Sequence, residues 1–153
     1  MKKIVLIVFT IFMFFLKNTA SANYEKKFYD FSIESISGET INFNDYKNKA
    51  VLIVNTASYC GFTKQYDELQ ELWDLYKSRG LIVIGVPSNS FNQEKNSNND
   101  VKEFCEVNFN INFPLTTITE VKGENAHELF KWAKDNHGKS AVPKWNFHKI
   151  LIN

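Results

Sequence analysis

The sequence of 153 residues predicts an α/β fold, with a mixed central β-sheet flanked by helices. Two apolar runs, residues 50–54 and 81–86, are typical of strands buried on both faces. Between them, apolar residues recur at spacings of three and four from Phe62 to Tyr76, which predicts an amphipathic helix that ends before Gly80. Strand, helix and strand follow one another closely enough to form a βαβ unit, so we expect the two strands to pair in parallel.

The first 22 residues have the pattern of a secretory signal peptide. A basic start precedes an apolar run at residues 4–16, and residues 20–22, Ala-Ser-Ala, fit the A-x-A cleavage pattern. The apolar run is shorter than the ~17–25 residues needed to span a bilayer, which favours cleavage over an uncleaved membrane anchor. We therefore expect a signal peptide at 1–22, a folded domain at 23–153, and export to the periplasm or secretion.

The charge of the chain argues against a nucleic-acid partner. The full sequence has 18 basic and 17 acidic residues, a net charge of +1. The predicted signal peptide contains three lysines and no acidic residue, so its removal shifts the net charge from +1 to −2. The sequence contains no basic stripe, and we expect no nucleic-acid binding.

The other elements are predicted from turn residues and periodicity. Short apolar runs on both sides of Ser37-Gly38-Glu39 predict a β-hairpin between residues 28 and 46. Ser97 and Asp100 are spaced as the capping box of a short helix. Residues 115–121 indicate a further strand.

Two more elements follow toward the C-terminus. Residues 124–136 predict a helix that Gly138 ends, with four residues facing inward: Ala126, Leu129, Phe130 and Ala133. Residues 145–152 predict a last strand.

Cys60 follows the first buried strand directly and precedes the helix. Reactive groups collect beyond the carboxyl ends of parallel strands. A thiol at a helix N-terminus also faces free backbone N–H groups and the positive end of the helix dipole, which favour the nucleophilic thiolate. The alternative is a buried structural cysteine. A position in a strand-to-helix turn followed by Gly61 favours the reactive role over this alternative. Thr63 stands where the second cysteine of a C-x-x-C redox pair would be, so such a pair is excluded.

Cys60 and Cys105 are the only cysteines of the chain. An even number in an exported protein points to a disulfide, which could be structural or catalytic. Cys105 lies on the predicted short helix, where a buried helix-face thiol is the alternative.

Three blocks of the sequence resemble the glutathione peroxidase family. Residues 51–63 (Val-Leu-Ile-Val-Asn-Thr-Ala-Ser-Tyr-Cys-Gly-Phe-Thr) are similar to its active-site segment. Residues 85–94 (Gly-Val-Pro-Ser-Asn-Ser-Phe-Asn-Gln-Glu) resemble its second block, and residues 144–149 (Lys-Trp-Asn-Phe-His-Lys) its Trp-Asn-Phe signature. The blocks occur in the family's order and span most of the expected domain. The resemblance implies a thioredoxin-like fold.

The resemblance also implies a catalytic tetrad of Cys60, Gln93, Trp145 and Asn146, with no metal and no organic cofactor. Amide and indole N–H groups can stabilise the Cys60 thiolate and the oxyanion that leaves the peroxide. Without the resemblance, Trp145 would be assigned to the core and Gln93 to solvent. Neighbouring residues of a regular strand point to opposite faces, so Trp145 and Asn146 can share one site only if the backbone is irregular there.

The second block departs from the family pattern at two places. One residue, Asn92, separates Phe91 from Gln93, where the family usually has two. Lys95-Asn96 replaces the usual Pro-Gly. We therefore expect the amide of Gln93 to sit differently from its family position.

The resemblance to the thioredoxin-dependent branch implies that Cys105 is the resolving cysteine. A sulfenic acid formed at Cys60 would condense with Cys105 to a disulfide, which an external dithiol would reduce. The resemblance thus implies a thiol-dependent peroxidase for hydrogen peroxide and for organic or lipid hydroperoxides, reduced by a thioredoxin-like protein or glutathione. The short stretch 132–145 lacks the loop of tetrameric members, so we expect a monomer with an open site.

Two other interpretations stay open. One is a general thiol–disulfide oxidoreductase. The other is a redox sensor, or an inactive truncated domain, with a structural Cys60–Cys105 bond. Family members continue beyond the segment matching 149–152 with a strand and a helix, so we expect the domain at 23–153 to lack these two elements.

Overall fold

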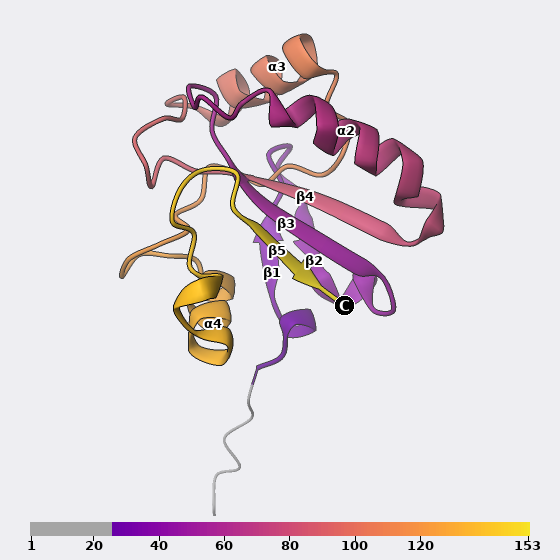
Figure 1. Cartoon of the computed structure of the whole chain (residues 1–153), viewed down its shortest axis with the longest axis vertical. Coiled ribbons are helices and arrows are strands. Elements are labelled where there is room, and N and C mark those ends of the chain that lie inside the picture. The colour runs from indigo at the N-terminus through magenta and orange to yellow at the C-terminus, as the bar shows by residue number, and fades with distance from the viewer. Residues whose placement is uncertain (1–25) are drawn as a thin grey trace, which may run out of the picture.

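The computed structural model describes residues 26–153, in which short strands and helices alternate around two small β-sheets (Figure 1). The predicted signal peptide at 1–22 lies outside the described residues. Among residues 26–153, no helix has the length and apolar character required to cross a membrane.

The predicted hairpin is confirmed. Strands β1 (Ser32–Glu34) and β2 (Thr40–Asn42) pair in antiparallel fashion with Ile33 opposite Ile41. Both isoleucines are buried, as the alternation of apolar and polar residues in each strand requires. The short 3₁₀-helices η1 (Phe28–Asp30) and η2 (Phe43–Tyr46) flank the hairpin.

The central sheet is mixed, as predicted. Strand β3 (Ala50–Thr56) lies in the middle, pairs in parallel with β4 (Leu81–Pro87), and pairs in antiparallel fashion with β5 (Lys149–Ile152). The two faces of β3 belong to two separate apolar clusters. Val51 and Ile53 lie in one cluster, and Val54 lies in the other. Both faces of the β3–β4 pair are therefore covered, which explains why these two strands are continuous apolar runs.

Helices α2 (Gln65–Tyr76) and α3 (Asn98–Phe109) lie together on one side of the sheet (Figure 1). The short 3₁₀-helix η3 (Lys77–Arg79) continues α2 to Gly80, whose φ of 92° ends it. Helix α4 (Glu128–His137) packs with the hairpin in the other cluster and is followed by η4 (Gly138–Ala141). The four inward-facing residues expected around α4 are all buried.

Two helices begin later than the periodicity predicts. Residues 62–64 form successive i→i+3 turns, so α2 begins at Gln65 and the Phe62 side chain is exposed. Helix α4 begins at Glu128 because the His127 side chain accepts a hydrogen bond from the N–H of Leu129 and caps the helix there.

The strand expected at 115–121 is wrong. The chain makes only isolated bridges there, Gly85 with Leu115 and Ser35 with Thr116. The pairing with β4 is interrupted after Thr116, because the next backbone N–H, that of Thr117, donates to Glu34 of β1 instead. The last strand is likewise shorter than predicted, since residues 145–148 are irregular.

Candidate active site

Cys60 lies in the turn, residues 58–64, that joins the end of β3 to α2. The side chain is buried, and Sγ accepts a hydrogen bond from the backbone N–H of Phe62 at 3.4 Å. The Thr63 hydroxyl reinforces the turn, with the carbonyl oxygen of Cys60 at 2.6 Å. The thiol was predicted to lie at the first turn of α2. That prediction is wrong, because the i→i+3 turns of residues 62–64 separate Cys60 from the helix. The N–H group that Sγ accepts belongs to the turn itself.

Residues 145–148 are held in an irregular turn by Asn55, near the end of β3. The Asn55 side chain donates to the carbonyl oxygen of Trp145 at 3.2 Å and accepts from the N–H of His148 at 3.0 Å. Its backbone oxygen accepts from the N–H of Phe147, which has a φ of 62°. This left-handed residue supplies the irregular backbone that a shared site requires.

The structure brings Gln93 and Asn146 together. Nδ2 of the buried Asn146 donates to Oε1 of Gln93 at 2.9 Å. The backbone oxygen of Gln93 accepts from the N–H of Tyr59, also at 2.9 Å, which ties the shortened loop to the Cys60 turn. Because Oε1 is engaged, the group that Gln93 has left to offer is the Nε2 donor. A φ of 57° at Asn92 allows the shortened loop to turn here.

Trp145 is not a core residue. It is 46% exposed, and its ring centroid lies 5.2 Å from that of Phe91. Within residues 26–153, no hydrogen bond joins its indole, or the amides of Gln93 and Asn146, to Sγ of Cys60. The catalytic roles of these three residues therefore stay predictions.

Glu94 is a further residue of this region that the sequence did not single out. Its carboxylate is buried, and Oε1 accepts from the backbone N–H groups of Ser58, at 3.0 Å, and Lys95, at 2.8 Å. Burial raises the pKa of Glu94, and these hydrogen bonds oppose the shift. Glu94 thus joins the loop that carries Gln93 to the turn that carries Cys60.

The substitution Glu94→Gln should change how stability depends on pH. The raised pKa means that the folded state binds the proton more tightly than the unfolded state, so this residue's contribution to stability falls as pH rises above about 4.5. Glutamine keeps Oε1 as the acceptor but carries no charge. We expect the melting temperature of E94Q, relative to wild type, to rise between pH 5 and pH 7.5. Thermal unfolding at both pH values checks this. A melting temperature of E94Q that falls relative to wild type between pH 5 and pH 7.5 would contradict it.

Cys105 lies on α3 and is fully buried in the same apolar cluster as Cys60. Both cysteines are free thiols in this structure. Burial raises the pKa of Cys105 from 9.0 to about 11. The thiol of Cys105 is therefore held protonated while α3 is in place.

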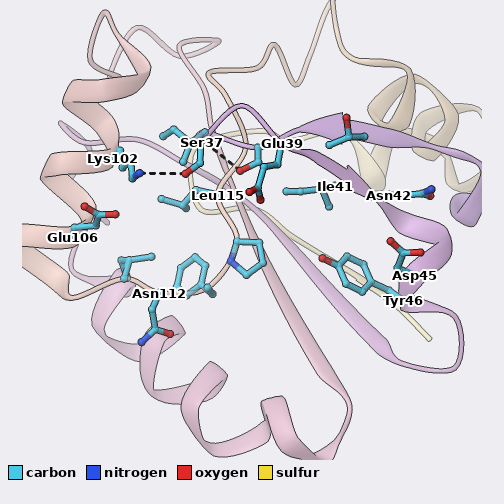
Figure 2. Close-up of a pocket in the computed structure, with 16 residues that line it drawn as sticks. Ser37, Glu39, Ile41, Asn42, Asp45, Tyr46, Lys102, Glu106, Asn112 and Leu115 are labelled. Carbon is cyan, nitrogen blue, oxygen red and sulfur yellow. Dashed lines mark hydrogen bonds between the residues drawn. The ribbon is translucent and has the colours of Figure 1, made fainter.

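The cavity of Figure 2, about 390 Å³ in volume, lies between the hairpin and α3 and is a different region. Lys102 of α3 points across it toward Ser37, with Nζ donating to Oγ at 3.2 Å (Figure 2). None of the predicted site residues lines this cavity. The residues from 26 onward also include no group of three or more His, Cys, Asp or Glu side chains placed to hold a metal ion.

The Cys60 turn, the Gln93 loop and the 145–148 turn come together at the end of β3, which is the arrangement that the three sequence blocks predict. The sequence profile of glutathione peroxidases matches residues 28–134. The chain belongs to the glutathione peroxidase family.

Several relatives in this family are similar over most of their length. The glutathione peroxidase of Lactococcus lactis is 43% identical over 130 residues, which cover 82% of each chain. The hydroperoxy fatty acid reductase of Synechocystis is 41% identical over 144 residues, covering 88% of this chain and 84% of the relative. The glutathione peroxidase-like peroxiredoxin 2 of Saccharomyces cerevisiae is 40% identical over 131 residues, covering 82% and 80%.

Solved structures confirm the thioredoxin-like fold. The apo crystal structure of Trgpx matches with a TM-score of 0.63 at 34% identity, covering 84% of this chain and 78% of that one. A thiol:disulfide interchange protein of Chlorobium tepidum matches with a TM-score of 0.62 at 18% identity, covering 80% and 74%, which shows a shared fold only. As a member of the glutathione peroxidase family, the chain is a thiol-dependent peroxidase.

Proposed function

We propose that the chain works as a two-cysteine peroxidase, in which Cys60 attacks the hydroperoxide and Cys105 resolves the product. The observation that carries this proposal is the placement of the cysteines. Two thiols far apart in the sequence are free and lie in one apolar cluster, one in the turn after β3 and the other on α3.

In the first step, the Cys60 thiolate attacks one oxygen of the O–O bond. An S–O bond forms, the O–O bond breaks, and the other oxygen leaves as an alkoxide, or as hydroxide when the substrate is hydrogen peroxide. The sulfur is oxidised to a sulfenic acid, and the leaving oxygen takes up a proton. N–H donors such as the Gln93 amide and the Trp145 indole suit the oxyanion that develops.

In the second step, the Cys105 sulfur attacks the sulfenic acid. The S–S bond forms, the S–O bond breaks, and the hydroxide leaves as water with the proton of the Cys105 thiol. With a pKa of about 11 rather than 9.0, the buried thiol is ionised about 100-fold less often at neutral pH than an ordinary cysteine. Cys105 therefore becomes reactive when α3 opens and exposes it to water.

The surroundings of Cys60 favour bulky apolar hydroperoxides in addition to hydrogen peroxide. Three aromatic side chains of the turns that meet at the end of β3 are strongly exposed: Tyr59 at 64%, Phe62 at 51% and Trp145 at 46%. Such rings can contact the hydrocarbon part of an organic or lipid hydroperoxide. The similarity to a hydroperoxy fatty acid reductase supports this substrate class.

The electron donor is a dithiol protein of the thioredoxin type, with glutathione as the alternative. The enzyme acts as a monomer, after export to the periplasm or secretion and removal of residues 1–22. The donor must then be a thiol-reducing protein that is present outside the cytoplasm.

Replacing Cys105 by serine should separate the two steps. We expect the variant to reduce one equivalent of peroxide as fast as wild type, and then to lose more than ~90% of thioredoxin-dependent turnover because its sulfenic acid is not resolved. Stopped-flow peroxide consumption measures the first turnover, and steady-state assays with thioredoxin or glutathione measure the second.

Peptide mapping without reductant, after one equivalent of peroxide, tests the same proposal in the wild-type protein. A Cys60–Cys105 disulfide supports it. A stable Cys60 sulfenic acid beside a free Cys105 thiol would exclude the resolving role. Reduction of insulin without peroxide turnover would instead favour a general oxidoreductase, although Thr63 replaces the second cysteine that such enzymes use.

A further inference from the structure

Lys95 connects the two segments that carry the cysteines. Its Nζ donates a hydrogen bond to the hydroxyl of Tyr59 at 3.2 Å and lies 4.9 Å from the centre of the Tyr59 ring. The same Nζ lies 5.2 Å from the centre of the Phe104 ring. Both rings are within the ~6 Å over which a cation is attracted to an aromatic face. One ammonium group thus binds two aromatic side chains at once.

The two rings are the immediate neighbours of the two cysteines. Tyr59 precedes Cys60 in the turn after β3, and Phe104 precedes Cys105 on α3. Phe104 also packs edge to face on Phe109, the last residue of the same helix, with ring centroids 5.6 Å apart. A contact that holds Phe104 therefore restrains the helical turn to which Cys105 belongs.

We propose that Lys95 is a positioning residue that clasps α3 against the Cys60 turn and thereby slows the capture of the Cys60 sulfenic acid by Cys105. This inference rests on the two-cysteine cycle proposed above. The consequence of the clasp is a longer lifetime of the sulfenic acid, during which further peroxide can oxidise it to the sulfinic acid.

The clasp opposes resolution because Cys105, fully buried on α3, is held as an unreactive protonated thiol. The helix must open to expose this thiol before the S–S bond forms and hydroxide leaves Cys60 as water. Movement of the Phe104 turn away from Tyr59 breaks at least one of the two contacts of Lys95. The energy of that contact adds to the cost of opening.

The charges around Lys95 favour the closed arrangement. Asp100, in the first turn of α3, and the neighbouring Glu94 are the acidic groups that act on its ammonium. A small surface hollow beside Phe104 is lined by Lys95 and by Glu103 of α3. The ammonium therefore stays charged at neutral pH, and the clasp is present under the conditions in which the enzyme works.

The substitution Lys95→Met tests the clasp, because methionine keeps most of the length and apolar character of the side chain and removes the charge. We expect disulfide formation after one equivalent of peroxide to become about 3- to 10-fold faster, the range that one or two exposed cation–π contacts give. Oxidation of Cys60 itself should be unchanged. Amide hydrogen exchange of α3 in the reduced protein should accelerate by a similar factor. Lys95→Arg keeps the cation and should restore both rates.

Lys49→Met is the matched control, since Nζ of Lys49 lies 5.8 Å from the Tyr46 ring, next to the hairpin and away from the cysteines. It should leave both rates at the wild-type value. Equal or slower disulfide formation in K95M would overturn the clasp while leaving the two-cysteine cycle intact. Failure of the wild-type protein to form any disulfide would overturn the cycle. In that case, unchanged hydrogen exchange of α3 in K95M would overturn the clasp as well.

Discussion

Replacing Cys60 by serine should lower peroxide turnover by at least ~1,000-fold, with every thiol donor. The attacking species is a thiolate, and the serine hydroxyl stays un-ionised near neutral pH and is a poor nucleophile toward an O–O bond. Stopped-flow consumption of hydrogen peroxide and of a fatty acid hydroperoxide, each under single-turnover conditions, measures the loss directly because neither depends on the electron donor.

The loss should be chemical and not structural. Serine is similar to cysteine in shape, and its Oγ can accept the N–H of Phe62 that Sγ accepts in the wild type. The unfolding transition should therefore shift by only a few degrees. Cys105→Ser is the matched control, since it removes the other buried thiol but should retain the first turnover. Cys60→Ser with more than about a tenth of the wild-type single-turnover rate would show that another group reduces the peroxide.

The parts of the fold that were predicted correctly are those in which local pattern and tertiary burial agree. The apolar runs at 50–54 and 81–86 become β3 and β4 because both faces of that strand pair are covered. Gly80 ends the preceding helical segment with a positive φ, as glycine does without strain. In each case the local sequence pattern and the tertiary packing favour the same structure.

The failed predictions concern segments whose conformation is set by distant partners. Residues 115–121 have the composition of a strand, but the backbone bonds first to β4 and then to β1, so no ladder continues. Residues 145–148 are irregular because Asn55, far away in the sequence, takes their backbone groups. Periodicity reports which face of an element is apolar, and it carries no information about such long-range hydrogen bonds.

The candidate site, like the fold, was predictable where the local sequence determines it and not where distant residues do. Its position after β3 follows from the strand and helix around Cys60, whereas Gln93, Trp145 and Asn146 were found only through the three family blocks. Glu94 and Lys95 were missed as functional candidates because a charged residue in a polar loop normally faces solvent. The departure of Lys95 from the family's proline was the one available signal.

Asn55→Ala should destabilise the protein by ~2–5 kcal/mol and lower peroxide turnover by about 10- to 100-fold. The buried Asn55 side chain satisfies the carbonyl oxygen of Trp145 and the N–H of His148, and alanine leaves both without their partner at a cost of about 1–3 kcal/mol each. Trp145 and Asn146 belong to that turn, so its loosening should move both away from Cys60. Chemical unfolding and single-turnover kinetics measure the two effects.

Asn42→Ala provides the comparison, since its exposed side chain also accepts one backbone N–H, that of Asn44, but lies in the hairpin region. We expect it to cost about 1 kcal/mol, the usual value of a helix cap, and to leave turnover unchanged. A variant Asn55→Ala that loses stability but keeps full turnover would mean that Trp145 and Asn146 are not needed near Cys60. Because stability and turnover are measured separately, that outcome would refute the tetrad while leaving the fold argument intact.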